Sequence, residues 1–308
     1  MYGQNMIFDK LVGDSILCVG IVTIDVISLL PEFPDTNSPM LASEMIFTGG
    51  GPAATVAVTL ARLGHQVKLV TSIGWDDLGR LALTHLDNEG VDLSAIERER
   101  NHKTTVSQVL VNSTNGDRMI IRKPEAHGQS AANHYNFDIP ATWVHLDQAG
   151  YAAISANGKR KHIFERHLIS IEGGDLIDEL DLEGVALYVP TVSQLQKFYG
   201  YSRTIGQLLL AATEAGAEVV VARDSNNGCY SLIDGEVWHV PFPKGEVLST
   251  LSAENVFHGA ILAAIVEGKN LKDSMEYANL CAFMSCAELD GRSAIPSREE
   301  LERKLGNI

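Results

Sequence analysis

Apolar residues recur along the chain in two alternating patterns, short continuous runs and longer segments with helical spacing. The run at residues 16–21 (ILCVGI) is typical of a buried strand, and residues 67–73 (VKLVTSI) form another. Between them, residues 52–63 carry apolar positions at helical spacing and end at Gly64, a residue that commonly follows a helix. This order predicts a strand, helix, strand unit.

The same alternation returns later in the chain. Helical spacing is found at residues 78–89, 205–215 and 253–267, and a further strand is predicted at residues 217–222. Alternating strands and helices are typical of a mainly parallel sheet covered by helices. We therefore predict an α/β fold, with residues 1–308 in a single domain because no Pro-, Gly- or Ser-rich linker divides them.

Two segments, residues 26–48 and 104–122, depart from this pattern. The second alternates in polarity on both sides of Asn115 and Gly116, which readily adopt the positive φ of a hairpin turn. The first is extended and rich in turn-forming residues. Together they are predicted to form a small sheet beside the main body, which would serve as a lid or as a dimer contact.

Composition and charge narrow the classes of partner. The chain has 308 residues and is 45% hydrophobic, which is enough for a large α/β core. Its formal net charge of −15 disfavours nucleic acid and anionic membrane surfaces, because both bind clustered Lys and Arg. The apolar stretch at residues 16–30 is interrupted by Asp25, unlike a signal peptide or a membrane span. We expect a cytoplasmic protein that binds small ligands or protein partners.

Cysteines and histidines give no signal of a metal site. No two cysteines have CxxC spacing, and no HxH or HExxH motif occurs. We therefore predict no metal site built from these residues, and buried, reduced thiols at Cys18, Cys229, Cys281 and Cys286.

Candidate ligand contacts lie at the carboxyl ends of predicted strands, where open α/β sheets bind their ligands. Asp25 follows Gly20 by five residues at the end of the first strand. Gly49, Gly50 and Gly51 open the helix at residues 52–63, where a backbone without Cβ atoms can approach a ligand closely. The triplet is followed by PAA rather than by the GxGxxG spacing, which disfavours a nicotinamide-dependent enzyme.

In their order and spacing, these motifs resemble the PfkB, or ribokinase, family of carbohydrate kinases. The resemblance rests on GxxxxD at residues 20–25, the glycine turn that ends in ARLG at 61–64, IGWDDLG at 73–79, EGVD at 89–92 and VFHGA at 256–260. It extends from about residue 16 to about residue 300. GGGPAAT and VFHGA are most similar to the branch that contains sulfofructose kinases.

The resemblance implies a three-layer α/β/α fold with a small β-sheet lid, often a homodimer through that lid, and phosphorylation of a sugar hydroxyl with ATP and Mg²⁺. Carried over by position, Asp25, Gly50, Gly51 and Thr55 would line the sugar pocket, and Thr55 stands where many members have Asn. Arg122, on the outgoing strand of the predicted hairpin, would also reach the sugar and would favour an anionic substituent.

The late helix departs from the family where phosphoryl transfer takes place. Family members carry DTxGAGD, whose amides hold the transferring group and whose last Asp deprotonates the hydroxyl, but this chain reads STLSAEN at residues 249–255. Asn255 thus takes the place of a base that contributes about 10²–10⁴-fold. Ala253 matches the motif, whereas Ser252, an expected N-cap, and Glu254 replace its glycines. The charge of Glu254 favours the helix but competes with phosphate for its amides.

Two more nucleotide-side elements differ from the family. After the strand at residues 217–222, Asp224 stands where the first glycine of a TxGxxG loop is expected, and one residue is inserted before Gly228. Residues 188–194 (YVPTVSQ) contain neither the Asn nor the Glu of the NxxE motif associated with Mg²⁺. The motifs expected to bind the nucleotide therefore differ from the family pattern, whereas the glycines expected to line the sugar pocket are retained. The use of ATP and Mg²⁺ is thus in doubt.

Three functional interpretations follow. The one we favour is a pseudokinase, a homologue that keeps a sugar-type pocket and has lost efficient phosphoryl transfer. The second is an active kinase with another carboxylate as base, for example Glu254, although its position about 100° from Asn255 on the helix should point it elsewhere. The third is a structural or regulatory dimer that retains the fold.

Overall fold

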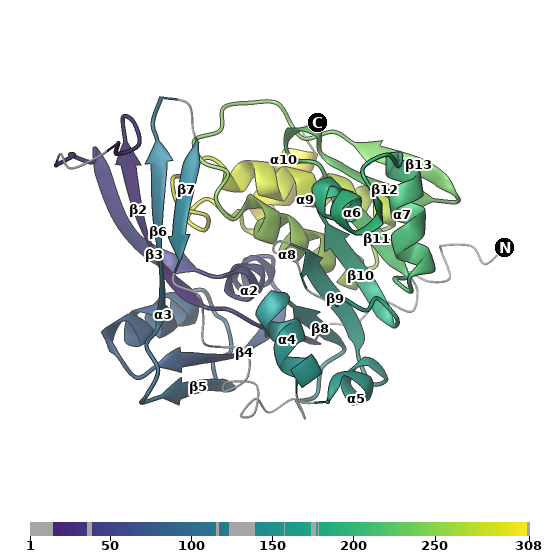
Figure 1. The fold of residues 1–308 in the computed structure, drawn as a ribbon, viewed down its shortest axis with the longest axis horizontal. Coiled ribbons are helices and arrows are strands. Elements are labelled where there is room, and N and C mark those ends of the chain that lie inside the picture. The colour runs from purple at the N-terminus through teal and green to yellow at the C-terminus, as the bar shows by residue number, and fades with distance from the viewer. Residues whose placement is uncertain are drawn as a thin grey trace.

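The computed structural model describes residues 15–35, 39–114, 117–122, 139–156, 158–173, 177 and 179–306. Within them, a large sheet has the strand order β13-β12-β11-β10-β9-β8-β1-β4-β5 (Figure 1). Neighbours from β5 to β11 pair in parallel, whereas β12 and β13 are antiparallel. The strands are β1 (Ser15–Val19), β4 (Gln66–Gly74), β5 (Ile96–Glu99), β8 (Trp143–Leu146), β9 (Leu168–Gly173), β10 (Val185–Pro190), β11 (Val219–Arg223), β12 (Cys229–Ile233) and β13 (Glu236–Val240).

Helices cover both faces of the large sheet and complete three layers (Figure 1). Side chains alternate across each strand, so that Ile16 and Cys18 of β1 join the core on one face while Leu17 and Val19 join the core on the other. The first face carries α2 (Pro52–Arg62), α3 (Asp77–Asn88), α8 (Ala253–Val266) and α9 (Leu271–Ser285), with α10 (Arg298–Leu305) beside α9. The second carries α4 (Gln148–Ala156), α5 (Arg160–Phe164), α6 (Val192–Tyr199) and α7 (Ile205–Glu214).

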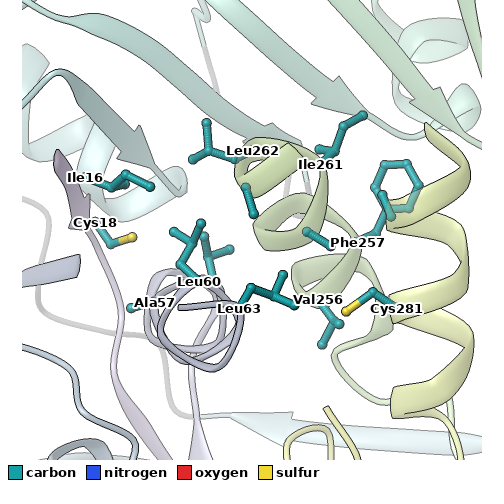
Figure 2. Packing of buried hydrophobic residues seen from close by; sticks show 14 of the residues in the cluster. Ile16, Cys18, Ala57, Leu60, Leu63, Val256, Phe257, Ile261, Leu262 and Cys281 are labelled. Carbon is teal, nitrogen blue, oxygen red and sulfur yellow. The ribbon is translucent and has the colours of Figure 1, made fainter. Parts of the chain in front are cut away.

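Helix α8 lies at the centre of the first layer. Every side chain from Asn255 to Val266 is buried, because α2, α9 and the sheet surround this helix. Figure 2 shows Leu60 of α2 and Leu63, which directly follows α2, on the side of Val256 of α8, with Cys281 of α9 next to Val256. A helix enclosed in this way holds the groups at its N-terminus in fixed positions relative to the sheet.

A second, smaller sheet stands off the main body beside α2 and α3 (Figure 1). It contains β2 (Thr23–Leu30), β3 (Glu44–Gly50), β6 (Thr105–Asn112) and β7 (Arg118–Arg122) in the order β3-β2-β6-β7. A separate apolar cluster, which includes Ile27, Val109, Leu251 and Leu289, connects this sheet to the body. The sheet therefore forms one wall above the start of α8.

The α/β fold predicted from the sequence is confirmed, and so is the second small sheet. The predicted hairpin is the antiparallel pair β6 and β7, although its turn residues Asn115 and Gly116 lie outside the described residues. The four cysteines are buried and free. None of the helices in the described ranges is long and apolar enough to cross a membrane.

Candidate functional site

A cavity of about 410 Å³, here called the large cavity, opens between the small sheet and the start of α8. Side chains of β2, β6 and β7 form one wall, and Gly51, Pro52 and the first residues of α8 form the other. Its size lies within the range of small-molecule sites, about 300–1,000 Å³. The large cavity is therefore the first candidate for a ligand site.

Asp25 of β2 supplies a carboxylate to the large cavity. It is 7% exposed and accepts a 2.7 Å hydrogen bond from Thr23 Oγ1. Burial raises the pKa of Asp25, while the bond from Thr23 and the charges of Arg292 and Arg122 oppose that rise. A Cβ on Gly50 would lie 2.2 Å from Asp25 Oδ2, so only glycine fits beside this carboxylate. A partly desolvated carboxylate of this kind is suited to accept hydrogen bonds from ligand hydroxyls.

The glycine turn before α2 is shaped by close contacts within the protein. Gly51 has φ +96°, and a Cβ there would lie 2.3 Å from the carbonyl oxygen of Ile21. The buried carboxylate of Asp147, at the end of β8, accepts hydrogen bonds from Ile21 N at 2.7 Å and Ala53 N at 3.3 Å. Asp147 thus already accepts a hydrogen bond from a backbone amide at the start of α2, where the sequence predicted that a ligand could approach.

Two of the predicted pocket residues, Thr55 and Gly50, do not line the large cavity. Thr55 is fully buried, and its hydroxyl accepts a 3.1 Å hydrogen bond from Arg292 Nε. The carbonyl of Gly50 accepts a 2.8 Å bond from Arg292 Nη2. Arg292 was not predicted, because it lies more than 230 residues away in sequence and only the fold brings it here. Asp25, Gly51 and Arg122 do line the cavity.

Positive charge in the large cavity comes from strand β7. Arg118 and Arg122 are four residues apart on this strand, which places both on one face, and both line the cavity. Arg118 also donates a hydrogen bond to Thr250 Oγ1. Only Arg122 was predicted from the sequence. Because side chains alternate between the two faces of a strand, Arg118 could have been predicted to lie on the same face. Two guanidinium groups in one cavity favour an anionic ligand group.

A second cavity of about 160 Å³, here called the small cavity, lies on the other side of the α8 start. Ala253, Gly228 and Arg118 are among its lining residues. Asn255 lines the large cavity but not the small one, whereas Glu254 lines both. Its carboxylate lies 3.3 Å from Arg223 Nη1.

The loop after β11 has its own internal contacts. Residues Ser225–Asn227 form a short 3₁₀ turn, and Asn227 Nδ2 donates a 3.0 Å hydrogen bond to Asp224. Asp224 is not among the residues that line the small cavity, whereas Ser225 and Gly228 are. On the opposite wall, Thr191 begins α6 through a capping box with Gln194. The YVPTVSQ segment therefore caps a helix with neutral side chains.

Ser252 occupies the N-cap position of α8 but does not cap it with its side chain, contrary to the sequence prediction. Its φ of +59° is left-handed, whereas residues that cap through a side chain have extended backbones. This conformation favours glycine. The amides of Ala253 and Asn255 donate to Thr250 O and Ser252 O, so part of the turn is internally bonded.

Asn255 faces the large cavity from the first turn of α8, and behind it lies Glu172 of β9. Asn255 Nδ2 donates a 2.5 Å hydrogen bond to Glu172 Oε1. Burial, assisted by the charge of Glu254, raises the pKa of Glu172 to about 8. Glu172 was not predicted from the sequence, although it lies at the carboxyl end of β9, much as Asp147 directly follows β8.

Further polar side chains lie deeper, between β8, β9 and α8. His145 and His258 are fully buried with ring centroids 4.5 Å apart, and Ser170 is hydrogen-bonded to His258 Nε2 at 2.6 Å. Burial lowers the pKa of both histidines, that of His145 to about 3. In the part of the chain that the structure describes, no three His, Cys, Asp or Glu side chains are arranged to hold a metal ion.

Comparisons with known proteins agree on one family. The sequence model of the pfkB family carbohydrate kinases matches residues 14–298. Ketohexokinase of Mus musculus is 22% identical over 287 residues, 88% of this chain and 95% of the relative. Ribokinase of Thermotoga maritima has a TM-score of 0.83 at 23% identity, over 96% of this chain and all of that one. Arabidopsis thaliana ribokinase, in a complex with ribose and ATP, has a TM-score of 0.81 at 20% identity, over 95% and 99% of the chains.

Proposed function

The chain belongs to the pfkB family of carbohydrate kinases, and from this premise we propose that it binds a sugar-like ligand in the large cavity and has lost efficient phosphoryl transfer. The observation that carries the proposal is Asn255, an amide at the position that the motif resemblance assigns to the catalytic Asp. An amide is not a usable base near neutral pH, and a positioned base contributes about 10²–10⁴-fold. Its amide nitrogen is engaged by Glu172.

The small cavity fits ATP and Mg²⁺ poorly. Its volume of about 160 Å³ is below the usual range of ligand sites, about 300–1,000 Å³. Glu254 also lines this cavity, and two like charges at about 4 Å repel by roughly 4 kcal/mol at an effective dielectric of about 20, so its carboxylate opposes a phosphate placed beside it. ATP and Mg²⁺ remain the cofactors that the family implies, and the size of the cavity and the charge of Glu254 disfavour the nucleotide.

The ligand class that we propose is a sugar with an anionic substituent. Asp25 would accept hydrogen bonds from its hydroxyls, and Arg118 with Arg122 would hold the anion. The resemblance of GGGPAAT and VFHGA to the sulfofructose kinase branch adds support, because a sulfonated sugar is anionic. The small sheet, which carries both arginines, would act as the lid of this pocket.

An active kinase is the second candidate, because Glu254 does reach the large cavity. In that case Glu254 would take the hydroxyl proton in place of Asn255. Its ion pair with Arg223 opposes this role, because the carboxylate is already engaged outside the large cavity, which Arg223 does not line. If Glu254→Gln removes a measurable activity of the wild type, this second candidate replaces the first.

The test of the proposed function combines binding with turnover. Purified protein is titrated with D-fructose, D-ribose, D-fructose 6-phosphate and ATP by calorimetry, and ADP release is followed with Mg²⁺ present. We expect saturable binding of D-fructose 6-phosphate, weaker binding of the neutral sugars, and ADP release far below the usual kinase range of about 1–100 s⁻¹. Turnover within that range would overturn the proposal.

We also propose a homodimer through the outer face of the small sheet. On that face, Met45 and Phe47 of β3 and Met119 and Ile121 of β7 are 46–60% exposed, and the strand register places them in adjoining rows. An exposed apolar face of this kind is typical of a protein contact. Sedimentation of Phe47→Glu should show a monomer if the wild type is a dimer, while Leu210→Glu, exposed on α7, should leave the wild-type mass unchanged. A monomeric wild type would contradict the proposal.

A further inference from the structure

The two ends of the Asn255 amide have different environments. An amide nitrogen only donates hydrogen bonds and an amide oxygen only accepts them. The nitrogen is bonded to Glu172 Oε1, below the floor of the large cavity. The oxygen has no hydrogen-bond partner among the described residues and is not one of their buried unsatisfied atoms. It is therefore open to the large cavity, which Asn255 lines.

Glu172 is placed to act on Asn255 and on nothing in the cavity. It is 2% exposed and lines neither cavity. Strand β9, which carries it, is paired on both sides by β8 and β10, so its position is rigid. Its second oxygen makes no hydrogen bond with the described part of the chain and lies 3.9 Å from His145 Nε2. A ligand would meet Glu172 only through Asn255.

We propose that Glu172 is a positioning residue, which holds the nitrogen of Asn255 inside the protein so that the amide oxygen accepts a hydrogen bond from a ligand hydroxyl. This inference rests on the proposed function, which supplies the ligand. The new point is that the amide oxygen of Asn255 is the atom that accepts its hydrogen bond. The amide oxygen accepts the hydroxyl hydrogen without removing the proton. The site would thus bind a hydroxyl group of the sugar without removing its proton.

Glu172 accepts this hydrogen bond in either protonation state, since the bonded oxygen Oε1 is a carbonyl oxygen when the proton is on Oε2. Its raised pKa, about 8, means that the carboxyl is neutral at pH 7 and ionises in mildly alkaline solution. A carboxylate binds an amide hydrogen more strongly than a neutral carboxyl does. The amide of Asn255 should therefore report the titration of Glu172.

The strands and the helix packed around Glu172 also place other titratable or charged groups near it. Neither histidine gains a proton above pH 6, because burial lowers the pKa of both. Burial also raises the pKa of Asp147. The groups are Cys18 of β1, His145 of β8, Asp147 after β8, Arg223 of β11, and Glu254 and His258 of α8.

The first test needs no ligand. Protein labelled with ¹⁵N-asparagine is titrated from pH 6 to pH 10, and the side-chain signals of Asn255 are assigned by their loss in Asn255→Asp. We expect these signals to move with a midpoint near pH 8 in the wild type and to stay fixed in Glu172→Gln, which imitates the neutral carboxyl. In Glu172→Leu they should shift to the values of a solvated amide.

The control is Ser170→Ala on the same strand, which removes a contact to His258 and should leave the Asn255 signals in place. Asn255 signals that are unchanged in Glu172→Leu, or that titrate equally in Glu172→Gln, would overturn the proposal. Should Glu172→Leu not fold, the comparison of the wild type with Glu172→Gln decides alone.

The second test measures binding of D-fructose 6-phosphate in a double-mutant cycle. Glu172→Leu should weaken binding about tenfold, while Glu172→Gln stays within about twofold of the wild type. In an Asn255→Ala background, Glu172→Leu should add less than about twofold. An equal loss in both backgrounds would mean that Glu172 acts only through stability. Failure of the wild type to bind D-fructose 6-phosphate counts against the proposed ligand class, and the amide signals still decide the role of Glu172.

Discussion

The large and small cavities meet at the start of α8 and differ in both size and charge. The large cavity measures about 410 Å³ and is lined by Asp25, Arg122, Arg118 and Glu254, whereas the small cavity measures about 160 Å³ and is lined by Arg118, Arg223 and Glu254. Asp25 and Arg122 thus line the large cavity alone, whereas Arg223 lines the small cavity alone and is already paired with Glu254. The two cavities share Arg118 and a single turn at the start of α8, so a substitution elsewhere in one wall can change one cavity and leave the other intact.

The largest effect expected is a gain of transfer when the shared turn is changed. The triple variant Ser252→Gly, Glu254→Gly, Asn255→Asp removes the anion from the small cavity and supplies a carboxylate at residue 255. We expect ADP release with D-fructose 6-phosphate to rise by about 10²-fold or more. Burial favours the proton on Glu172, so the new Asp would be the ionised member of the pair.

The matched control for that gain is the double variant Ser252→Gly, Glu254→Gly, which keeps Asn255. It should bind ATP more tightly than the wild type and turn over slowly. Equal rates in the double and triple variants would show that the missing base is not what limits transfer.

A smaller loss is expected on the large-cavity side. Arg122→Ala should weaken binding of D-fructose 6-phosphate by about 10–100-fold, because a hydrogen bond between charged groups contributes about 1.5–3 kcal/mol. Binding of D-fructose should change little, and calorimetry measures both. Arg80→Ala, an exposed arginine of α3 outside both cavities, is the control. Equal losses for the two sugars would contradict an anion site at Arg122.

The stability of the folded protein should depend on pH through Glu172, which lies behind the large cavity. Its pKa is raised to about 8 in the folded protein, above the value of about 4.3 in an unfolded chain. The folded state therefore retains a proton that the unfolded state has lost, so this contribution is fully present below about pH 4 and is lost as pH rises through 8. The melting temperature should fall from pH 6.5 to pH 9, and Glu172→Gln should reduce that fall. A variant that follows the wild type at every pH would rule out Glu172 as the source.

The smallest effect concerns the backbone of the shared turn. Ser252→Gly should raise stability by about 1 kcal/mol, or roughly 2 °C in melting temperature, because φ is +59° at this residue. Ser193→Gly in the helix α6 should instead lower stability, by about 0.5–1 kcal/mol. If Ser252→Gly is also destabilising, contacts of the Ser252 side chain outweigh the backbone strain.

The sequence by itself determined the alternation of strands and helices, the small sheet and the family resemblance. Hydrophobic periodicity and the φ preferences of glycine are local properties, so they are visible without the fold. Helices at residues 52–63 and 253–267 and strands at residues 16–21 and 67–73 appear in the structure within a few residues of those bounds. Asn255 was likewise visible as a departure from the DTxGAGD motif of the family that the sequence resembles.

Only the tertiary structure decided which side chains meet. Arg292 reaches Thr55 across 237 residues, and Glu172 reaches Asn255 across 83. The structure also showed that Glu254 faces both cavities and that Ser252 has a left-handed backbone. Contacts between distant segments arise from how strands align in the sheet and how helices cover them, and no local pattern in the sequence records that alignment.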